Sequence, residues 1–117
     1  MNNKLAEALA TKYNLHQEGL NLFYGRPSGI YTVITFYNQS KNFQMLFGAT
    51  KDDVMKNTSK LLEEIGQINL IQEVEEHPHS ILVRGRTSLR NAPLQESIEA
   101  VLDKILPFLQ EGYHSGS

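Results

Sequence analysis

Two histidines separated by one proline are the residues best suited to metal chemistry in this sequence of 117 residues. His77 and His79 flank Pro78. The carboxylate of Glu75 or Glu76 could complete a set of nitrogen and oxygen ligands for a transition metal. The segment lies between two predicted strands at the length of a tight hairpin, and an exposed tip has no surrounding side chains to orient such ligands. An ordinary surface turn is therefore the simpler interpretation, and we predict no metal site.

Three arginines are candidates for contact with an anion. Arg26 lies in a loop that begins and ends with glycine, and Arg84 and Arg86 alternate along a predicted strand. Guanidinium groups bind phosphate and carboxylate through paired hydrogen bonds. However, the loop lacks the lysine and hydroxyl residue of a phosphate loop, and Glu73 and Glu75 would face the strand arginines. A plain strand connection and a neutralised charge ladder are the simpler interpretations of these arginines.

Catalytic chemistry has little support in the residue types or their spacing. The chain has no cysteine, which excludes thiol catalysis, thiolate metal sites and disulfides. No serine stands at a recognisable motif spacing from a histidine, and paired carboxylates fall at the ends of predicted elements, where solvated charge is usual. We therefore predict that the protein is not an enzyme, has no catalytic residue and needs no cofactor.

The bulk composition is that of one ordinary globular domain. Hydrophobic residues make up 40% of the chain, charged residues 21%, and the formal net charge is −2. This balance gives nucleic acid no electrostatic advantage, and no apolar stretch approaches the roughly 20 residues of a membrane span. We expect a cytoplasmic protein without membrane insertion or a nucleic-acid partner. Residues 1–111 are assigned to one domain and residues 112–117 to a flexible tail or a cloning remnant.

Hydrophobic periodicity predicts three helices and five strands in the order helix, three strands, helix, two strands, helix. The helices are predicted at 3–13, 50–66 and 93–109, and the strands at 20–24, 30–37, 43–49, 67–76 and 80–87. We expect Gly66 to end the second helix in a left-handed conformation and Pro107 to kink or loosen the last turn of the third. The order predicts an α+β fold with an antiparallel sheet packed against helices.

The first long hairpin has a register that predicts two apolar faces. A loop at 38–41 places Phe36 opposite Phe43, Ile34 opposite Met45 and Thr32 opposite Phe47 on the buried face. The opposite face is unusually apolar for a sheet surface in contact with water. Its candidate interface residues are Tyr31, Val33, Tyr37 and Leu46. We expect a second chain or another protein to bury them, although a covering helix would also explain their character.

The second hairpin is predicted to join its strands through a short loop at His77 and Pro78. That register pairs Val74 with Ile81 and Leu70 with Gly85 on the core face. Acidic and basic side chains on the other face would then satisfy one another, because Glu73 lies diagonal to Arg84.

The predicted order of elements resembles the fold of type III secretion chaperones, which is also seen in the YbjN group of small bacterial proteins. The resemblance covers nearly the whole chain and depends on the order and lengths of the elements alone. It implies a protein that dimerises and holds partner peptides on sheet and helix surfaces, and it implies no specific site residue.

Two functions follow from these observations. The first is a small intracellular protein-binding module, an adapter or chaperone-like protein, that acts as a homodimer through the apolar sheet face. The alternative is a regulatory domain that binds a small molecule or an anion near Arg26 or near Arg84 and Arg86.

Overall fold

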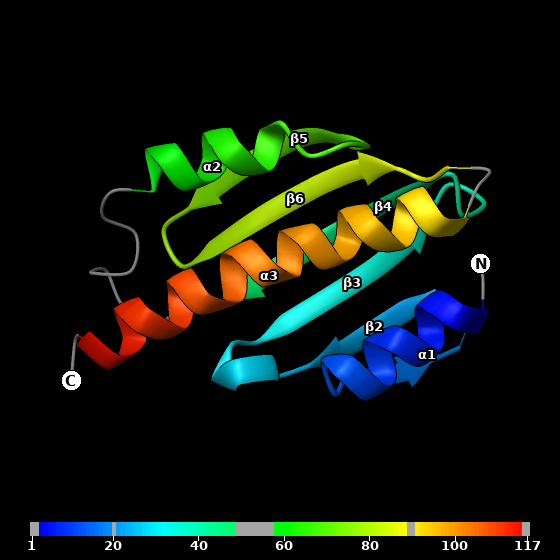
Figure 1. The fold of residues 1–117 in the computed structure, drawn as a ribbon, viewed down its shortest axis with the longest axis horizontal. Coiled ribbons are helices and arrows are strands. Elements are labelled where there is room, and N and C mark those ends of the chain that lie inside the picture. The colour runs from blue at the N-terminus through cyan, green and yellow to red at the C-terminus, as the bar shows by residue number, and fades with distance from the viewer. Residues whose placement is uncertain (1–2, 20, 49–57, 89–90, 116–117) are drawn as a thin grey trace.

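The computed structural model describes residues 3–19, 21–48, 58–88 and 91–115 of the chain. Its helices are α1 (Asn3–Lys12), α2 (Ser59–Gly66) and α3 (Asn91–Ser115), and a 3-10 turn, η1, covers Pro27–Gly29. Its strands are β1 (His16–Glu18), β2 (Leu22–Gly25), β3 (Thr32–Tyr37), β4 (Asn42–Gly48), β5 (Ile71–His77) and β6 (Ser80–Arg86). The predicted α+β class is confirmed, with helices packed on an antiparallel sheet (Figure 1).

The six strands form one sheet in the order β1-β2-β3-β4-β6-β5, and every neighbouring pair is antiparallel. The chain leaves β4, passes through α2 and enters the edge strand β5. It then returns through a hairpin so that β6 lies between β4 and β5. The helices follow the predicted order. β1 is not among the predicted strands. Its three residues are polar and exposed, so the sequence has no alternation of apolar and polar residues there that would predict a strand.

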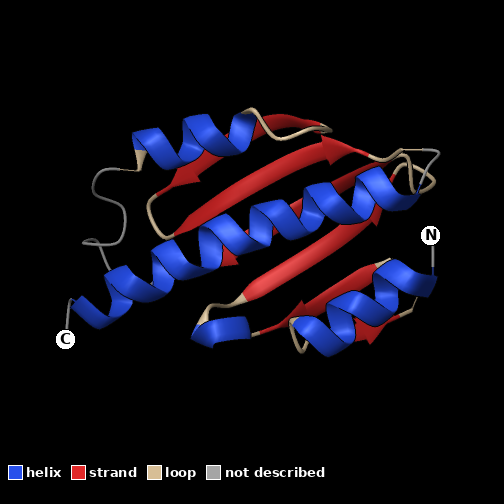
Figure 2. Ribbon diagram, in the orientation of Figure 1, coloured by secondary structure: helices blue, strands red, loops and turns tan. Residues whose placement is uncertain are grey.

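All three helices pack on one side of the sheet, and their apolar side chains share a single core with that side (Figures 1 and 2). α3 crosses the middle strands, while α1 and α2 lie toward opposite edges of the sheet. The helices contribute the core residues Leu5, Leu9, Leu61, Ile65, Leu94, Ile98, Val101, Leu102, Ile105, Leu106 and Leu109. The sheet contributes Phe23, Ile34, Phe36, Phe43, Met45, Phe47, Ile81 and Val83.

The hairpin of β3 and β4 has the predicted register. Phe36 lies opposite Phe43, and Ile34 lies opposite Met45. These residues are almost completely buried, whereas the residues between them on each strand are more exposed. The period of two residues therefore assigns the two faces of this hairpin correctly.

The predicted register of β5 and β6 is wrong by two residues. Val74 pairs with Val83 instead of Ile81, because a two-residue turn places His77 opposite Ser80. β5 also begins later than predicted, and Ile71, rather than Leu70, pairs with Gly85 beyond an irregularity in the ladder. Side chains alternate between the two faces of a strand, so a shift of two residues leaves each side chain on the same face. From Glu73 onward, the residues of β5 therefore lie on the sides of the sheet that were predicted.

Two predictions about helix ends also need correction. Gly66 is the last residue of α2, but the positive φ expected there occurs instead at Leu70, at 74°. Pro107 does not stand in a last turn, because α3 continues to Ser115. The predicted start of the second helix at Thr50 lies outside the described residues.

Candidate functional site

The sheet side that carries no described helix is the candidate site, and we call it the outer face. It is formed by Glu18, Leu22, Thr35, Tyr37, Asn42, Gln44, Arg84, Arg86 and Glu73, and by a central row of His16, Tyr24, Val33, Leu46, Leu82 and Glu75. Each residue of the central row is the strand partner of the next. The row therefore crosses the whole sheet, with a charged or titratable residue at each end and apolar side chains between.

The predicted interface residues all lie on or beside the outer face. Val33 and Leu46 are strand partners on the two middle strands. Tyr37 lies at the end of β3, and Tyr31 precedes its start, where the carbonyl oxygen of Tyr31 accepts a 2.8 Å hydrogen bond from the backbone N–H of Gly48. The two tyrosines are the large hydrophobic side chains classed as exposed in the described part of the chain, at 44% and 41%.

Leu82 is a central residue of this face that the sequence analysis missed, as it missed Tyr24. It is only 9% exposed, yet it lies outside the hydrophobic core cluster, since it points away from the helices beside Leu46. Its two chain neighbours, Ile81 and Val83, are core residues. The run of three apolar residues from Ile81 to Val83 is the sequence signal that could have shown that this strand is apolar on both faces.

Charged side chains on β5 and β6 neutralise one another at one edge of the outer face. Arg84 Nη1 lies 3.1 Å from Glu73 Oε2 and 3.6 Å from Glu75 Oε2. The hydrogen bond with Glu73 is the main cause that raises the pKa of Arg84 above its ordinary value. Arg84 also lines a hollow of about 470 Å³ with Thr35, Tyr37 and Gln44. With two carboxylates already beside it, this guanidinium is a poor receptor for a further anion.

The other two candidate arginines do not join Arg84 in one site. Arg86 is exposed at the end of β6, in line with Asn42 and Tyr37. Arg26 lies just before η1, with its guanidinium carbon 5.6 Å from the centre of the Tyr31 ring. Tyr31 and Tyr37 flank β3 at opposite ends, and a strand of this length spans about 20 Å. A single small anion could not contact all three arginines.

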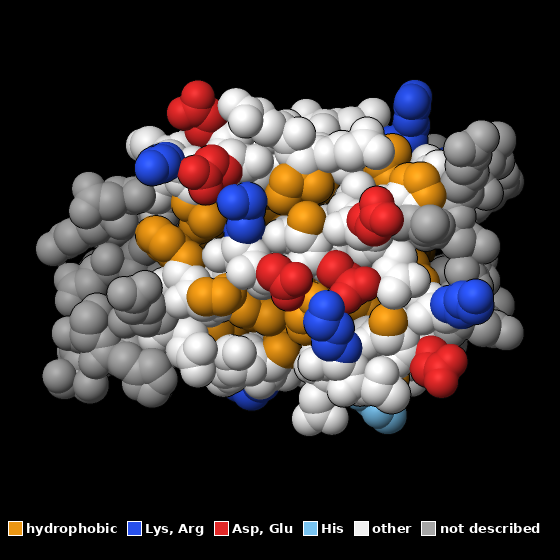
Figure 3. Space-filling view, viewed as in Figure 1, with side chains coloured by type: hydrophobic (Ala, Val, Ile, Leu, Met, Phe, Trp, Pro, Cys, Tyr) orange, Lys and Arg blue, Asp and Glu red, His pale blue; other side chains and the backbone are white. Residues whose placement is uncertain are grey.

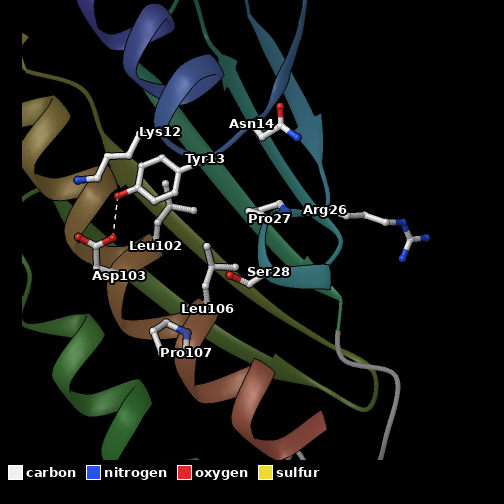
Figure 4. A pocket seen from close by; sticks show the side chains of 10 residues that line it. All are labelled: Lys12, Tyr13, Asn14, Arg26, Pro27, Ser28, Leu102, Asp103, Leu106 and Pro107. Atoms are coloured by element: carbon white, nitrogen blue, oxygen red, sulfur yellow. Dashed lines mark hydrogen bonds between the residues drawn. The ribbon is translucent and has the colours of Figure 1, made fainter. Parts of the chain in front are cut away.

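A cleft of about 580 Å³ lies on the helix side, between the end of α1, the η1 turn and α3 (Figure 4). Its lining residues are Lys12, Tyr13, Asn14, Arg26, Pro27, Ser28, Leu102, Asp103, Leu106 and Pro107. The hydroxyl of Tyr13 donates a 2.7 Å hydrogen bond to Asp103 Oδ1, and Lys12 Nζ lies 2.6 Å from Glu99 Oε1. Figure 4 shows the Arg26 side chain pointing away from these groups.

Tyr13 is engaged with Asp103, and Lys12 is engaged with Glu99, which lies beside the cleft. Burial is the main cause that raises the pKa of Tyr13, and the hydrogen bond to Asp103 acts in the same direction. The hydrogen bond from Lys12 is the main cause that lowers the pKa of Glu99. These contacts fasten the end of α1 to α3, and that structural role accounts for the carboxylates of Glu99 and Asp103.

The helix side as a whole carries acidic and basic side chains close to one another, with apolar side chains showing in patches between the helices (Figure 3). Within the described residues, no three His, Cys, Asp or Glu side chains are placed to hold a metal ion. His77 Nε2 lies 3.5 Å from Glu75 Oε2, and His79 is exposed in the turn. The helices described here include none that is both long and apolar enough to cross a membrane.

Comparison with known proteins identifies no relative: no family model matches the chain, and no curated protein and no solved structure is significantly similar to it. The resemblance to type III secretion chaperones therefore stays a prediction from the order of the elements.

Proposed function

We propose that this chain is a small intracellular protein-binding module that self-associates through the outer face of its sheet. One observation carries the proposal. The described helices all pack on one side, and the other side has an apolar centre that no described helix covers, with Val33 and Leu46 half-buried and Leu82 9% exposed. Apolar surface of this kind gains free energy when it is removed from water.

The distribution of residues across the outer face supports an interface. Val33 and Leu46 occupy the two middle strands, whereas Glu18 and Glu75 lie on the two edge strands. Protein interfaces commonly have an apolar, aromatic-rich centre and a polar rim. Tyrosine suits such a surface, since its ring can be buried while its hydroxyl stays hydrogen-bonded or wet.

The edges of the sheet favour association through the face over association by strand addition. β1 contains three residues, and β5 contains an irregularity between Ile71 and Glu73 and is rich in glutamate. Short strands, bulges and charged side chains all hinder pairing with another edge strand.

The area of the outer face is that of a small protein interface. The six strands contain 3, 4, 6, 7, 7 and 7 residues, and at about 3.3 Å per residue and about 4.8 Å between strands they cover roughly 540 Å² before side-chain relief is counted. A standard interface buries about 800 Å² on each partner. A second copy of the chain that covered this face would therefore bury less than a standard interface and would bind with modest affinity.

The test is the molar mass in solution, measured by light scattering and sedimentation over a range of protein concentrations. We expect the wild-type protein to form a dimer and Val33→Lys to be monomeric with an unchanged circular dichroism spectrum, because the substitution would bury a charge at the centre of the interface. Ala100→Lys is the matched control, since it adds the same charge on α3, on the opposite side of the molecule.

A wild-type protein that stays monomeric at millimolar concentration would contradict the proposal. A dimer that survives in Val33→Lys would place the interface elsewhere. The double variant Val33→Lys with Tyr37→Glu extends the test to the rim of the face.

The alternative of an anion-binding regulatory domain has weaker support. Arg84 contacts two glutamates, and Arg26 points away from the cleft that its loop lines.

A further inference from the structure

We infer that the cleft on the helix side is a binding site for a small organic cation, an apolar ring or chain that carries a protonated amine, and that Asp103 holds the amine. The inference does not depend on the proposed function, because the cleft and the outer face lie on opposite sides of the sheet. The volume of the cleft, about 580 Å³, lies within the range of about 300–1,000 Å³ that is usual for ligand pockets.

The wall of the cleft is largely apolar. Leu102 and Leu106 are buried side chains of α3 that lie one turn apart and line it. Pro27 and Pro107 add two rigid rings from η1 and α3. Figure 4 shows the ring of Tyr13 beside Leu102, on the α1 side of the same space. Such a wall favours the apolar body of a ligand, since both surfaces are removed from water when they meet.

Asp103 has two hydrogen-bond acceptors that the fold does not use fully. In the described part of the chain, Tyr13 donates to Oδ1 of its carboxylate, which leaves Oδ2 able to accept from a ligand. Pro107 stands four residues later inside α3 and has no N–H, so the backbone carbonyl of Asp103 lacks its usual donor in the helix. Both Asp103 and Pro107 line the cleft. An ammonium group has three donors and no acceptor, and it therefore matches these acceptors.

The two basic residues that line the cleft are turned toward other partners. Lys12 Nζ lies 2.6 Å from Glu99 Oε1. Arg26 points away from the cleft, and its guanidinium carbon lies 5.6 Å from the centre of the Tyr31 ring. Among the charged residues of the lining, the Asp103 carboxylate is thus the group with room for a ligand, and a carboxylate favours a cation. The expected ligand has the opposite charge to the anion considered for Arg26.

Tryptamine is a suitable probe, because the chain has no tryptophan and the fluorescence anisotropy of the indole ring then reports binding directly. Tryptophol and indole-3-acetate carry a hydroxyl and a carboxylate on the same ring in place of the amine. With protein titrated to millimolar concentration at pH 7, we expect tryptamine to bind about tenfold more tightly than tryptophol, and indole-3-acetate to bind more weakly still. Undetectable binding of tryptamine, or equal affinity for all three probes, overturns the inference.

Asp103→Asn removes the charge and keeps an oxygen that can accept the hydrogen bond from Tyr13. We expect this variant to keep the circular dichroism spectrum of the wild type, to bind tryptamine about tenfold more weakly and to bind tryptophol unchanged. Glu64→Gln is the matched control, because it removes the same charge from α2, outside the cleft, and should leave tryptamine binding unchanged. An equal loss of affinity in both variants would show a general effect of net charge and overturn the site.

Pro107→Ala separates binding from stability, because it should strengthen the fold. Alanine restores the N–H that hydrogen-bonds the carbonyl of Asp103, so we expect a higher melting temperature. Tryptamine binding should nevertheless weaken, since the carbonyl is then occupied and the proline ring is lost from the wall. A stabilised Pro107→Ala protein that binds tryptamine as tightly as the wild type would overturn the assignment of the amine to this carbonyl.

Discussion

Glu99 connects the first helix of the chain to the last. Its carboxylate lies 2.6 Å from Lys12 Nζ and accepts a 2.9 Å hydrogen bond from Gln95. Lys12 and Glu99 are 87 residues apart in the sequence, so their contact depends on the packing of α1 beside α3. Nothing in the local pattern around either residue predicts such a pair.

The lowered pKa of Glu99 has a defined consequence for stability. A carboxyl with a lowered folded pKa contributes stability above its unfolded value, near 4.5, and this contribution is lost as the pH falls through the folded value. Lys12→Met removes the main cause of the shift. We therefore expect the variant to be less stable at pH 7 and to lose less stability between pH 7 and pH 3 than the wild type.

Urea denaturation at the two pH values measures this difference. Lys104→Met is the control, because Lys104 of α3 lies 3.4 Å from Glu64 of α2, a carboxylate more exposed than that of Glu99. An equal response to acid in the wild type and in Lys12→Met would show that the Lys12 contact does not stabilise the folded state.

At the scale of the elements, the two hairpins show what the sequence could and could not predict. The register of β3 and β4 follows from strict alternation on both strands. The register of β5 and β6 depends on the two-residue turn that places His77 opposite Ser80. The start of β5 depends on the backbone of Leu70, whose φ is 74°, and on the irregularity before Glu73. A non-glycine residue with positive φ is uncommon and has no sequence signature, so the true start of β5 could not be predicted.

Gly85 is the residue on which the packing of β6 depends most clearly. A Cβ at this position would lie 2.4 Å from Phe43 Cζ and 2.7 Å from the carbonyl oxygen of Leu70. Gly85→Ala should therefore lower the free energy of unfolding by about 1–3 kcal/mol, as overpacking typically does. Gly66→Ala is the control, since nothing lies within 4 Å of its Cβ position in α2, and it should raise stability by about 0.5–1 kcal/mol. Chemical denaturation that gave both variants the same sign would contradict this account of Gly85.

At the scale of the whole molecule, only part of the outer face could be predicted from the sequence. Val33 and Leu46 could be placed because they belong to one hairpin. Leu82 and Tyr24 could not, because their positions depend on the order of strands in the sheet, and β6 reaches β4 only through a crossover. The sequence therefore predicted the two residues at the middle of the outer face, but not Leu82 and Tyr24, which extend the apolar surface on either side of them.

Self-association through this face would couple stability to concentration. A dimer that forms only from folded chains stabilises them by mass action, so the melting temperature rises with protein concentration. We expect this rise in the wild type and in Ala100→Lys, and a constant melting temperature in Val33→Lys. Differential scanning fluorimetry over a hundredfold range of concentration is a sufficient measurement, and a constant value in the wild type would oppose a dimer that dissociates on unfolding.

The position of α3 across the middle strands also determines when the protein can fold during synthesis. Seven core residues, Leu94, Ile98, Val101, Leu102, Ile105, Leu106 and Leu109, belong to this last helix. Until it leaves the ribosome, the aromatic side chains of β3 and β4 have no helix to cover them across the middle of the sheet. The nascent hairpin of β3 and β4 therefore lacks this cover from the completion of β4 at Gly48 until α3 has been made, a state in which chains aggregate readily or bind chaperones.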